Sequence, residues 1–284
     1  MDEVIGTIMI GGNREENPAK FDIRQYLLID DQSDLEWTHK LDIAIFSFIR
    51  HGCTKVIIDS DGDTMDDVEK VLRVINRISE ANMVSELRTN GVLISNSSDY
   101  MWRLYGAGLN ILNVDRITMN YYDDYNGGLS SLEYIIRGCN KYGIMVNLSI
   151  TTHKECVSTY SDVINSCKLA KKLGANKIII KQMEYPYKWQ MKLAGPENTQ
   201  KVRKYIKANK LSDDDWDKIS NLLVLRHTYI LESTLSDTYM VNGIQLEVMN
   251  SWCQLGTLCD IVELIYETDG HMRYSQKYRN AIIF

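Results

Sequence analysis

Short apolar runs, often β-branched, alternate along the chain with longer segments whose apolar residues recur at helical spacing. Residues 55–59 form one such run, which ends in an acidic turn centred on a glycine and is followed by the helix-like segment 65–80. This succession is typical of a β-strand joined to an α-helix. The same pattern predicts further strands over residues 4–10, 85–89, 115–120, 145–151 and 177–182.

Helices are predicted between these strands. Within 34–50, a buried helix face is indicated by the spacing of Leu41, Ile45, Phe48 and Ile49. The remaining helices are expected over 98–105, 130–142 and 160–173. From residue 55 onward the strands start roughly thirty residues apart, which is the length of one strand and its crossover helix in a parallel sheet.

The pattern changes after residue 196. Two amphipathic helices are predicted over 197–208 and 212–223, and strand-like runs follow over 228–232 and 243–248. A hairpin is expected around Thr268-Asp269-Gly270, because a tight turn between strands favours glycine at a position of positive φ. We therefore expect two domains: a barrel-like unit over 1–196 and a C-terminal extension over 197–284 with helices and a small β unit.

The alternation of strands and helices predicts the α/β class with a parallel sheet. Polar, glycine-rich and aromatic residues gather where the predicted strands end, and a parallel barrel places its binding site at that end. The six predicted strands are fewer than the eight of a closed barrel. The expected fold is an open, partial (β/α)6 barrel of the TIM type with a C-terminal α+β extension.

Composition limits the location and the partners. The chain has 284 residues, of which 44% are apolar and 25% charged, as in a folded soluble protein. A net charge of -6 disfavours non-specific binding to nucleic acid. The six cysteines are too few and too irregularly spaced for a disulfide scaffold. No apolar run approaches the ~20 residues of a membrane span, so we expect a cytoplasmic protein without a membrane partner.

Three short motifs lie at predicted strand ends. Asp61-Gly62-Asp63-Thr64 follows the second strand, Thr89-Asn90-Gly91 follows the third, and Arg116-Ile117-Thr118-Met119-Asn120 falls on the fourth. In this order they resemble the radical S-adenosylmethionine superfamily, over roughly residues 4–183. Members of that family have a partial six-stranded barrel, a Gly-Gly-Glu-Pro-like turn after the second strand and often Thr-Asn-Gly after the third. The resemblance implies a site for S-adenosylmethionine at the strand ends.

The chain departs from this family at the iron-sulfur cluster. The family's first strand ends in a Cys-x3-Cys-x2-Cys loop that binds the cluster, whereas Asn13, Asn17 and Lys20 stand at those three offsets here. Clusters are held by thiolates, and neither an amide nor an ammonium is a soft anionic ligand. We therefore expect no cluster at residues 13–20. Without a cluster, reductive cleavage of S-adenosylmethionine lacks its electron source.

Cys253 and Cys259 resemble the auxiliary cluster site that some family members carry near their C-terminus. Tyr274-Ser275 stands where that site would need another cysteine. Two thiols alone make a poor metal site, so we expect structural cysteines at these two positions.

The resemblance assigns ligand contacts to polar residues at the strand ends. Asp63 takes the place of a carboxylate that contacts the amino group of the ligand's methionine, and capping of the next helix is a compatible role. The other candidates for cofactor binding are Gly62, Thr89, Asn90, Thr118, Asn120, Asn147, Thr151 and Gln182. These groups could hydrogen-bond a ribose or an amino-acid backbone, or could only satisfy one another inside the barrel.

Three functions follow from these patterns. The first is a cluster-less binding or regulatory protein that keeps a pocket for a small molecule or a peptide. The second is an enzyme on the same barrel that uses polar or metal-assisted chemistry through Asp61, Asp63, His153 and Glu155, or a peptide-modification enzyme with a non-standard cofactor site. The third is a module that binds a peptide or a partner protein by accepting an extended strand at a sheet edge.

Overall fold

The computed structural model describes residues 5–10, 34–60, 63–116, 128–185, 188–232, 236–249, 263–267 and 271–274. Six parallel strands pair in chain order, as the sequence predicts. They are β1 (Ile5–Ile10), β2 (Lys55–Ser60), β3 (Val84–Thr89), β4 (Ile111–Arg116), β5 (Met145–Thr151) and β6 (Lys177–Lys181).

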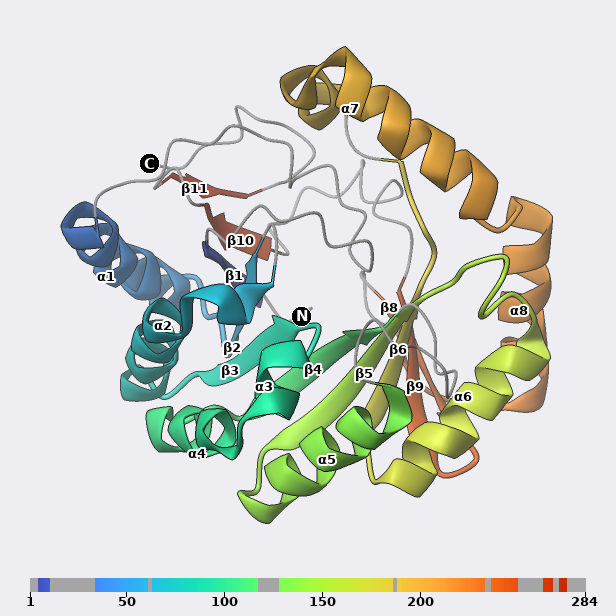
Figure 1. Cartoon of the computed structure of the whole chain (residues 1–284), viewed down its shortest axis with the longest axis horizontal. Helices are drawn as coiled ribbons and strands as arrows, with labels where there is room; N and C mark the ends of the chain where they lie inside the picture. The colour runs from blue at the N-terminus through green and yellow to red at the C-terminus, as the bar shows by residue number, and fades with distance from the viewer. Residues whose placement is uncertain are drawn as a thin grey trace.

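Helices connect these strands and cover the outer, convex side of the curved sheet (Figure 1). They are α1 (Asp34–Arg50), the 3-10 helix η2 (Thr64–Asp67), α2 (Val68–Glu80), α3 (Val92–Asn96), α4 (Ser98–Ala107), α5 (Gly128–Lys141) and α6 (Tyr160–Leu173). The helix α6 shows how the sequence sets these bounds. Thr159 and Asp162 form a reciprocal capping box at its start, and Gly174 ends it with a φ of 90°.

The C-terminal strands extend the same sheet at both edges. After α7 (Lys188–Asn209) and α8 (Asp213–Arg226) come β7 (Thr228–Glu232), β8 (Ser236–Val241), β9 (Ile244–Met249), β10 (Glu263–Tyr266) and β11 (Met272–Arg273). The strand β9 pairs parallel with β6, and β8 and β7 follow it antiparallel. The strand β10 pairs parallel with β1 and antiparallel with β11, as the predicted hairpin requires.

The whole sheet has the order β11-β10-β1-β2-β3-β4-β5-β6-β9-β8-β7. Among the described strands, no pairing joins β11 to β7, so the sheet is mixed, mostly parallel and not shown as closed. Strands from both predicted domains therefore share one sheet. The division of the chain at residue 196 stays a prediction.

Several predicted boundaries were wrong. The strand β4 begins at residue 111 rather than 115, because the inward-facing Asn113 interrupts the apolar run. The strand β8 was not predicted, because the buried Ser236 and Thr238 give it little apolar character. The side chain of Ile49 is 49% exposed and does not lie on the buried face of α1. The helix α7 starts before 197, with Gly195 (φ 82°) breaking its helical backbone.

The main apolar core lies between the sheet and the helices. Alternate residues of each strand, such as Val56 and Ile58 of β2 or Val146 and Leu148 of β5, pack there with side chains of the helices. Because successive strand residues point to opposite faces, the intervening residues face the inside of the curved sheet. Many of these intervening residues are polar or charged, which makes the inner face the place to search for a site.

Candidate functional site at the inner face of the sheet

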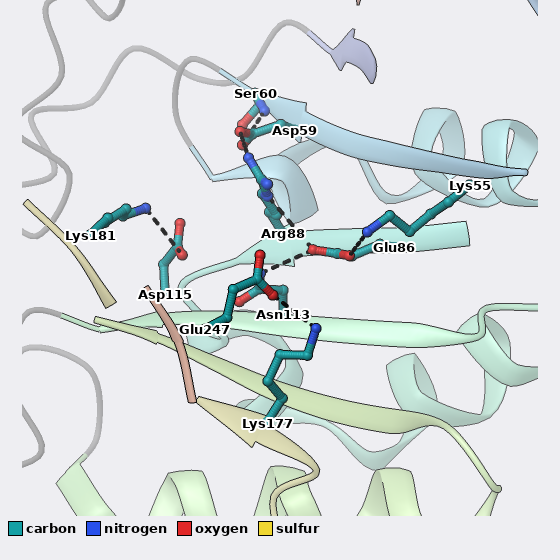
Figure 2. Close-up of polar contacts among 10 residues, drawn as sticks. All are labelled: Lys55, Asp59, Ser60, Glu86, Arg88, Asn113, Asp115, Lys177, Lys181 and Glu247. Atoms are coloured by element: carbon teal, nitrogen blue, oxygen red, sulfur yellow. Dashed lines mark hydrogen bonds and ion pairs between the residues drawn. The ribbon is translucent and has the colours of Figure 1, made fainter. Parts of the chain in front are cut away.

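The inner face carries charged side chains from several neighbouring strands. Figure 2 shows Lys55 and Asp59 of β2, Glu86 and Arg88 of β3, Asn113 and Asp115 of β4, Lys177 and Lys181 of β6 and Glu247 of β9. The charged or amide residues stand two positions apart in β3 and β4 and four apart in β2, so those of each strand share one face. The charges form ion pairs toward both the amino and the carboxyl ends of the strands.

The pairs toward the amino ends are short, and their side chains are buried or partly buried. The Lys177 Nζ lies 2.8 Å from Glu247 Oε2. The Lys55 Nζ lies 3.3 Å from Glu86 Oε2, and Asn113 Nδ2 donates to Glu86 Oε1 at 3.1 Å. Burial alone would raise the pKa of Glu86, but Lys55, Arg88 and the Asn113 amide outweigh it and lower the pKa below its usual value. These pairs hold neighbouring strands together.

The pairs toward the carboxyl ends are longer, and one of them includes the most exposed side chain of the set, Lys181. The Arg88 Nη1 lies 3.5 Å from Asp59 Oδ2, and the Lys181 Nζ lies 3.6 Å from Asp115 Oδ1. The Lys181 side chain is 40% exposed, compared with 28% for Lys177. Among these charged groups, Lys181 is therefore the one that a ligand can reach most easily.

Two acceptor oxygens of β4 are buried without a hydrogen bond from the described residues. They are Asn113 Oδ1 and Asp115 Oδ1, and the latter has only the long ion pair to Lys181. Buried polar atoms are nearly always hydrogen-bonded, so an exception needs an explanation. A ligand that donates hydrogen bonds would satisfy both oxygens.

The Thr89-Asn90-Gly91 motif forms a closed turn. Thr89 Oγ1 donates to Asp63 Oδ1 at 2.6 Å and accepts from the Gly91 N–H at 3.1 Å. Asn90 Oδ1 accepts from the Val92 N–H at 2.8 Å, at the start of α3. Gly91 has a φ of 79°, and a Cβ there would lie 2.9 Å from Ile135 Cδ1. Every residue of the motif is thus used to build the turn.

Asp63 belongs to the same arrangement. Its side chain also accepts from the Met65 N–H at 3.4 Å and caps η2, as the sequence allows. The side chains of Asp63 and Thr89 are both buried. The structure therefore brings these two candidates together.

The other candidates are scattered. Asn147 is buried on β5 beside Asn113 of β4, and Thr151, at the end of β5, is the register partner of Lys181. Gln182 donates to Asp213 Oδ1 of α8 at 3.5 Å. The remaining three candidates, Gly62, Thr118 and Asn120, lie outside the described residues.

The residues proposed for polar or metal-assisted catalysis do not form a described cluster. His153 is buried, its Nδ1 accepts from the Glu155 N–H at 3.1 Å, and its ring lies beside the Tyr205 ring of α7. Burial lowers the pKa of His153, although Glu155 opposes the shift. Among the described residues, no group of three His, Cys, Asp or Glu could hold a metal ion, and Asp61 lies outside them.

The most informative charged residues were missing from the sequence candidates. The structure pairs Glu86 with Arg88 and Asp115 with Lys181, all inside strands rather than in the loops after them. The available signal was the placement of polar residues at every second position of otherwise apolar strands, as in Glu86-Leu87-Arg88 and Asn113-Val114-Asp115. That period indicates a polar inner face.

No protein-family model matches the chain, and no curated protein sequence matches it. Among solved structures, SuiB from Streptococcus suis bound to the precursor peptide SuiA matches with a TM-score of 0.56 and 9% identity, over 97% of this chain and 60% of that chain. SuiB bound to S-adenosylmethionine matches with a TM-score of 0.55 and 9% identity, over 98% of this chain and 60% of that chain.

The chain thus spans about 60% of the length of SuiB. Coproporphyrinogen III oxidase (HemN) from Escherichia coli, a radical SAM enzyme, matches more weakly, with a TM-score of 0.45 and 9% identity. The match covers 89% of this chain and 68% of that chain, and no conclusion is based on it. At such low identity, likeness shows a shared fold and not a shared activity. The chain has the fold of SuiB, and at the level of the fold this confirms the resemblance to radical S-adenosylmethionine enzymes that its sequence motifs indicate.

Proposed function

We propose that this protein is a cluster-less relative of the radical S-adenosylmethionine enzymes that binds a small molecule at the carboxyl ends of its parallel strands, without radical chemistry. One observation carries the proposal: Asn13, Asn17 and Lys20 stand at the three cysteine offsets of the cluster loop. The protein would act as a binding or regulatory partner.

The donor set does not fit an iron-sulfur cluster. Amide and ammonium groups cannot replace three thiolates, which supply both the charge and the soft sulfur that iron needs. Two of the described cysteines do not offer an easy substitute, because burial raises the pKa of Cys139 and of Cys167 to about 12. Cys253 and Cys259 lie outside the described residues.

The strand ends nevertheless keep groups that suit a polar ligand. Lys181 and Arg88 offer N–H donors, and Asp115, Asn113 and Asn147 offer oxygen acceptors. S-adenosylmethionine is our first candidate ligand, because SuiB has been observed bound to it. These groups bind and orient a ligand in this proposal, and no bond of the ligand is broken.

Iron and sulfide analysis tests the loss of the cluster. After anaerobic reconstitution and desalting, the wild-type protein should retain almost no inorganic sulfide. A matched variant with Asn13→Cys, Asn17→Cys and Lys20→Cys restores the Cys-x3-Cys-x2-Cys spacing and serves as the control for cluster uptake. Stoichiometric iron and sulfide in the wild-type protein would contradict the proposal.

Calorimetry with S-adenosylmethionine tests the retained binding site. We expect saturable binding to the wild-type protein without added iron, and weaker binding to Arg88→Gln. Saturation should also raise the midpoint of thermal unfolding, since a ligand that binds only the folded state stabilises it. An absence of heat at millimolar ligand would exclude this compound as the ligand.

A peptide is the second candidate ligand, favoured by the observation that SuiB was solved with a precursor peptide. This chain spans only part of SuiB, so the comparison supports the shape of the barrel rather than a particular peptide site. Co-purification with small peptides encoded beside this protein's own coding sequence tests it. Repeated failure to retain any of them would leave the small-molecule proposal alone.

A further inference from the structure

The inner face of β4 presents two acceptors that the described protein residues do not satisfy. Asn113 is 1% exposed, and neither its Oδ1 nor the Oδ1 of Asp115 receives a hydrogen bond from the described residues. The two residues stand two positions apart in the strand, so both side chains face the inside of the sheet, about 6.6 Å apart along it. Two buried acceptors without a donor among the described residues need an explanation, and a ligand that donates hydrogen bonds is one.

A cation lies near Asp115. The Lys181 Nζ of β6 is 3.6 Å from Asp115 Oδ1, which is an ion pair but too long for a normal hydrogen bond. The Lys177–Glu247 pair on the same face, by contrast, is closed at 2.8 Å. The ammonium of Lys181 has three N–H donors and its side chain is 40% exposed, so it can bind an incoming anion while it stays near Asp115.

We propose that Asp115 and Lys181 bind the α-amino-acid group of a ligand, which deepens and rests on the proposed function. The ligand's ammonium donates to Asp115 Oδ1, and its carboxylate accepts from the Lys181 ammonium. Asn113 Oδ1, one side-chain repeat deeper, accepts a second donor from the ligand, directly or through one water. The ligand class is therefore a zwitterionic amino acid or a compound that carries one.

Charge balance favours a zwitterion over a singly charged ligand. The inner face pairs the carboxylates of Asp59, Glu86, Asp115 and Glu247 with the cations of Lys55, Arg88, Lys177 and Lys181. A simple anion would draw Lys181 away from Asp115 and leave a mostly buried carboxylate uncompensated, which is costly. A zwitterion gives both partners a further opposite charge and leaves the net charge of the face unchanged.

Comparing two related compounds measures how much the amino-acid group contributes to binding. S-adenosylhomocysteine carries it, whereas 5′-methylthioadenosine keeps the nucleoside and the sulfur without it. By calorimetry we expect the wild-type protein to bind S-adenosylhomocysteine at least about tenfold more tightly, equivalent to about 1.4 kcal/mol. L-methionine is the third probe: if it binds and depends on the same residues, the inference holds with a free amino acid as the ligand.

Single substitutions test whether Asp115 and Lys181 cause the preference for S-adenosylhomocysteine. Asp115→Asn and Lys181→Met should each reduce the preference for S-adenosylhomocysteine to about threefold or less, and Lys177→Met, which alters the closed pair, should leave it unchanged. Lys181→Met keeps the test usable if Asp115→Asn folds poorly, because Lys181 is partly exposed.

The failures can be told apart. Equal binding of both adenosine compounds by the wild-type protein, without binding of L-methionine, would overturn this inference and leave the proposed function standing. A preference that persists in both variants would overturn the assignment to Asp115 and Lys181. No binding of any of the three probes at millimolar concentration would overturn both the inference and the proposed small-molecule site.

Discussion

The ends of β3 and β4 are neighbours in the sheet, yet their polar residues differ in what they do. At the end of β3, Thr89 bonds Asp63 and the backbone of Gly91, and Asn90 Oδ1 accepts from the Val92 N–H at the start of α3. On the inner face of β4, Asn113 Oδ1 and Asp115 Oδ1 lack hydrogen bonds from the described residues. The polar groups at the end of β3 have hydrogen-bond partners within the protein. The two oxygens of β4 have none among the described residues, and a ligand could supply the donors.

This difference distinguishes a sequence motif that shapes the fold from side chains that are available to bind a ligand. Thr89-Asn90-Gly91 matches the family pattern closely, but its side chains are occupied in shaping the turn between β3 and α3. Asp115 matches no motif outright, yet it faces a partly exposed cation across the sheet. Substitutions at the first end should therefore affect stability, and substitutions at the second should affect ligand binding.

The largest loss of stability is expected from Gly91→Ala. The residue has a φ of 79°, and the added Cβ would meet Ile135 Cδ1 at 2.9 Å and Val114 Cγ1 at 3.2 Å. Backbone strain and overpacking together should lower the free energy of unfolding by about 3 kcal/mol in urea denaturation. Gly52→Ala is the matched control, because its φ is 73° but nothing lies near its Cβ, and it should cost only about 1 kcal/mol.

Glu86 links the two strand ends, because Asn113 of β4 donates to this carboxylate of β3. Glu86→Gln should lower the free energy of unfolding by about 2 kcal/mol at pH 7, since Lys55 loses its anionic partner. An equal loss in Glu86→Gln and in the exposed pair variant Lys201→Gln would contradict the importance of burial here.

Glu86 should also make the free energy of unfolding depend on pH. Because the pKa of Glu86 is lowered in the folded protein, its stabilisation is complete above the ordinary value of 4.5 and is lost as the pH falls through that value toward the folded pKa. Unfolding measured from pH 6 to pH 4 should show a steeper loss of stability in the wild-type protein than in Glu86→Gln.

A smaller loss is expected from Thr89→Val, which keeps the shape of the side chain but removes the hydroxyl. Asp63 then loses a 2.6 Å hydrogen bond inside the protein, and we expect a cost of about 1 to 2 kcal/mol in denaturant unfolding. Thr89→Ser keeps the hydroxyl and should cost less. If the valine variant were as stable as the wild-type protein, the turn would not depend on this bond.

The smallest effect on stability is expected from Lys181→Met. The Lys181 side chain is 40% exposed and its ion pair spans 3.6 Å, but Asp115 is mostly buried, so the variant should lower the free energy of unfolding by no more than about 1 kcal/mol. Its effect should instead appear in calorimetry, as weaker binding of S-adenosylmethionine. A large loss of stability without a change in binding would reverse the contrast between the two strand ends.

The sequence predicted the order of the parallel strands and the existence of most helices, because apolar periodicity is strong in them. The start of β4 was misplaced for a physical reason: Asn113 is polar although it is buried, so the strand does not look apolar. The joining of β9 to β6 and of β10 to β1 depends on pairing between distant segments, which periodicity does not encode.

Among the described helices, none is long and apolar enough to cross a membrane.

For the site, motif matching and structure point to different residues. The motifs led to Thr89 and Asn90, whose partners within the turn could not be seen in one dimension. The alternation of Glu86 with Arg88 and of Asn113 with Asp115 was visible in the sequence. Which of these atoms find partners depends on the neighbouring strands, and the sequence alone does not set that register.

The most direct test of the account is the dependence of S-adenosylmethionine binding on iron and sulfide. Calorimetry would be run on one preparation before and after anaerobic reconstitution with both. The account predicts saturable binding with the same dissociation constant, within about twofold, in the two samples. Binding that occurs only after reconstitution, together with retained iron and sulfide, would show that a cluster holds the ligand and would contradict the account.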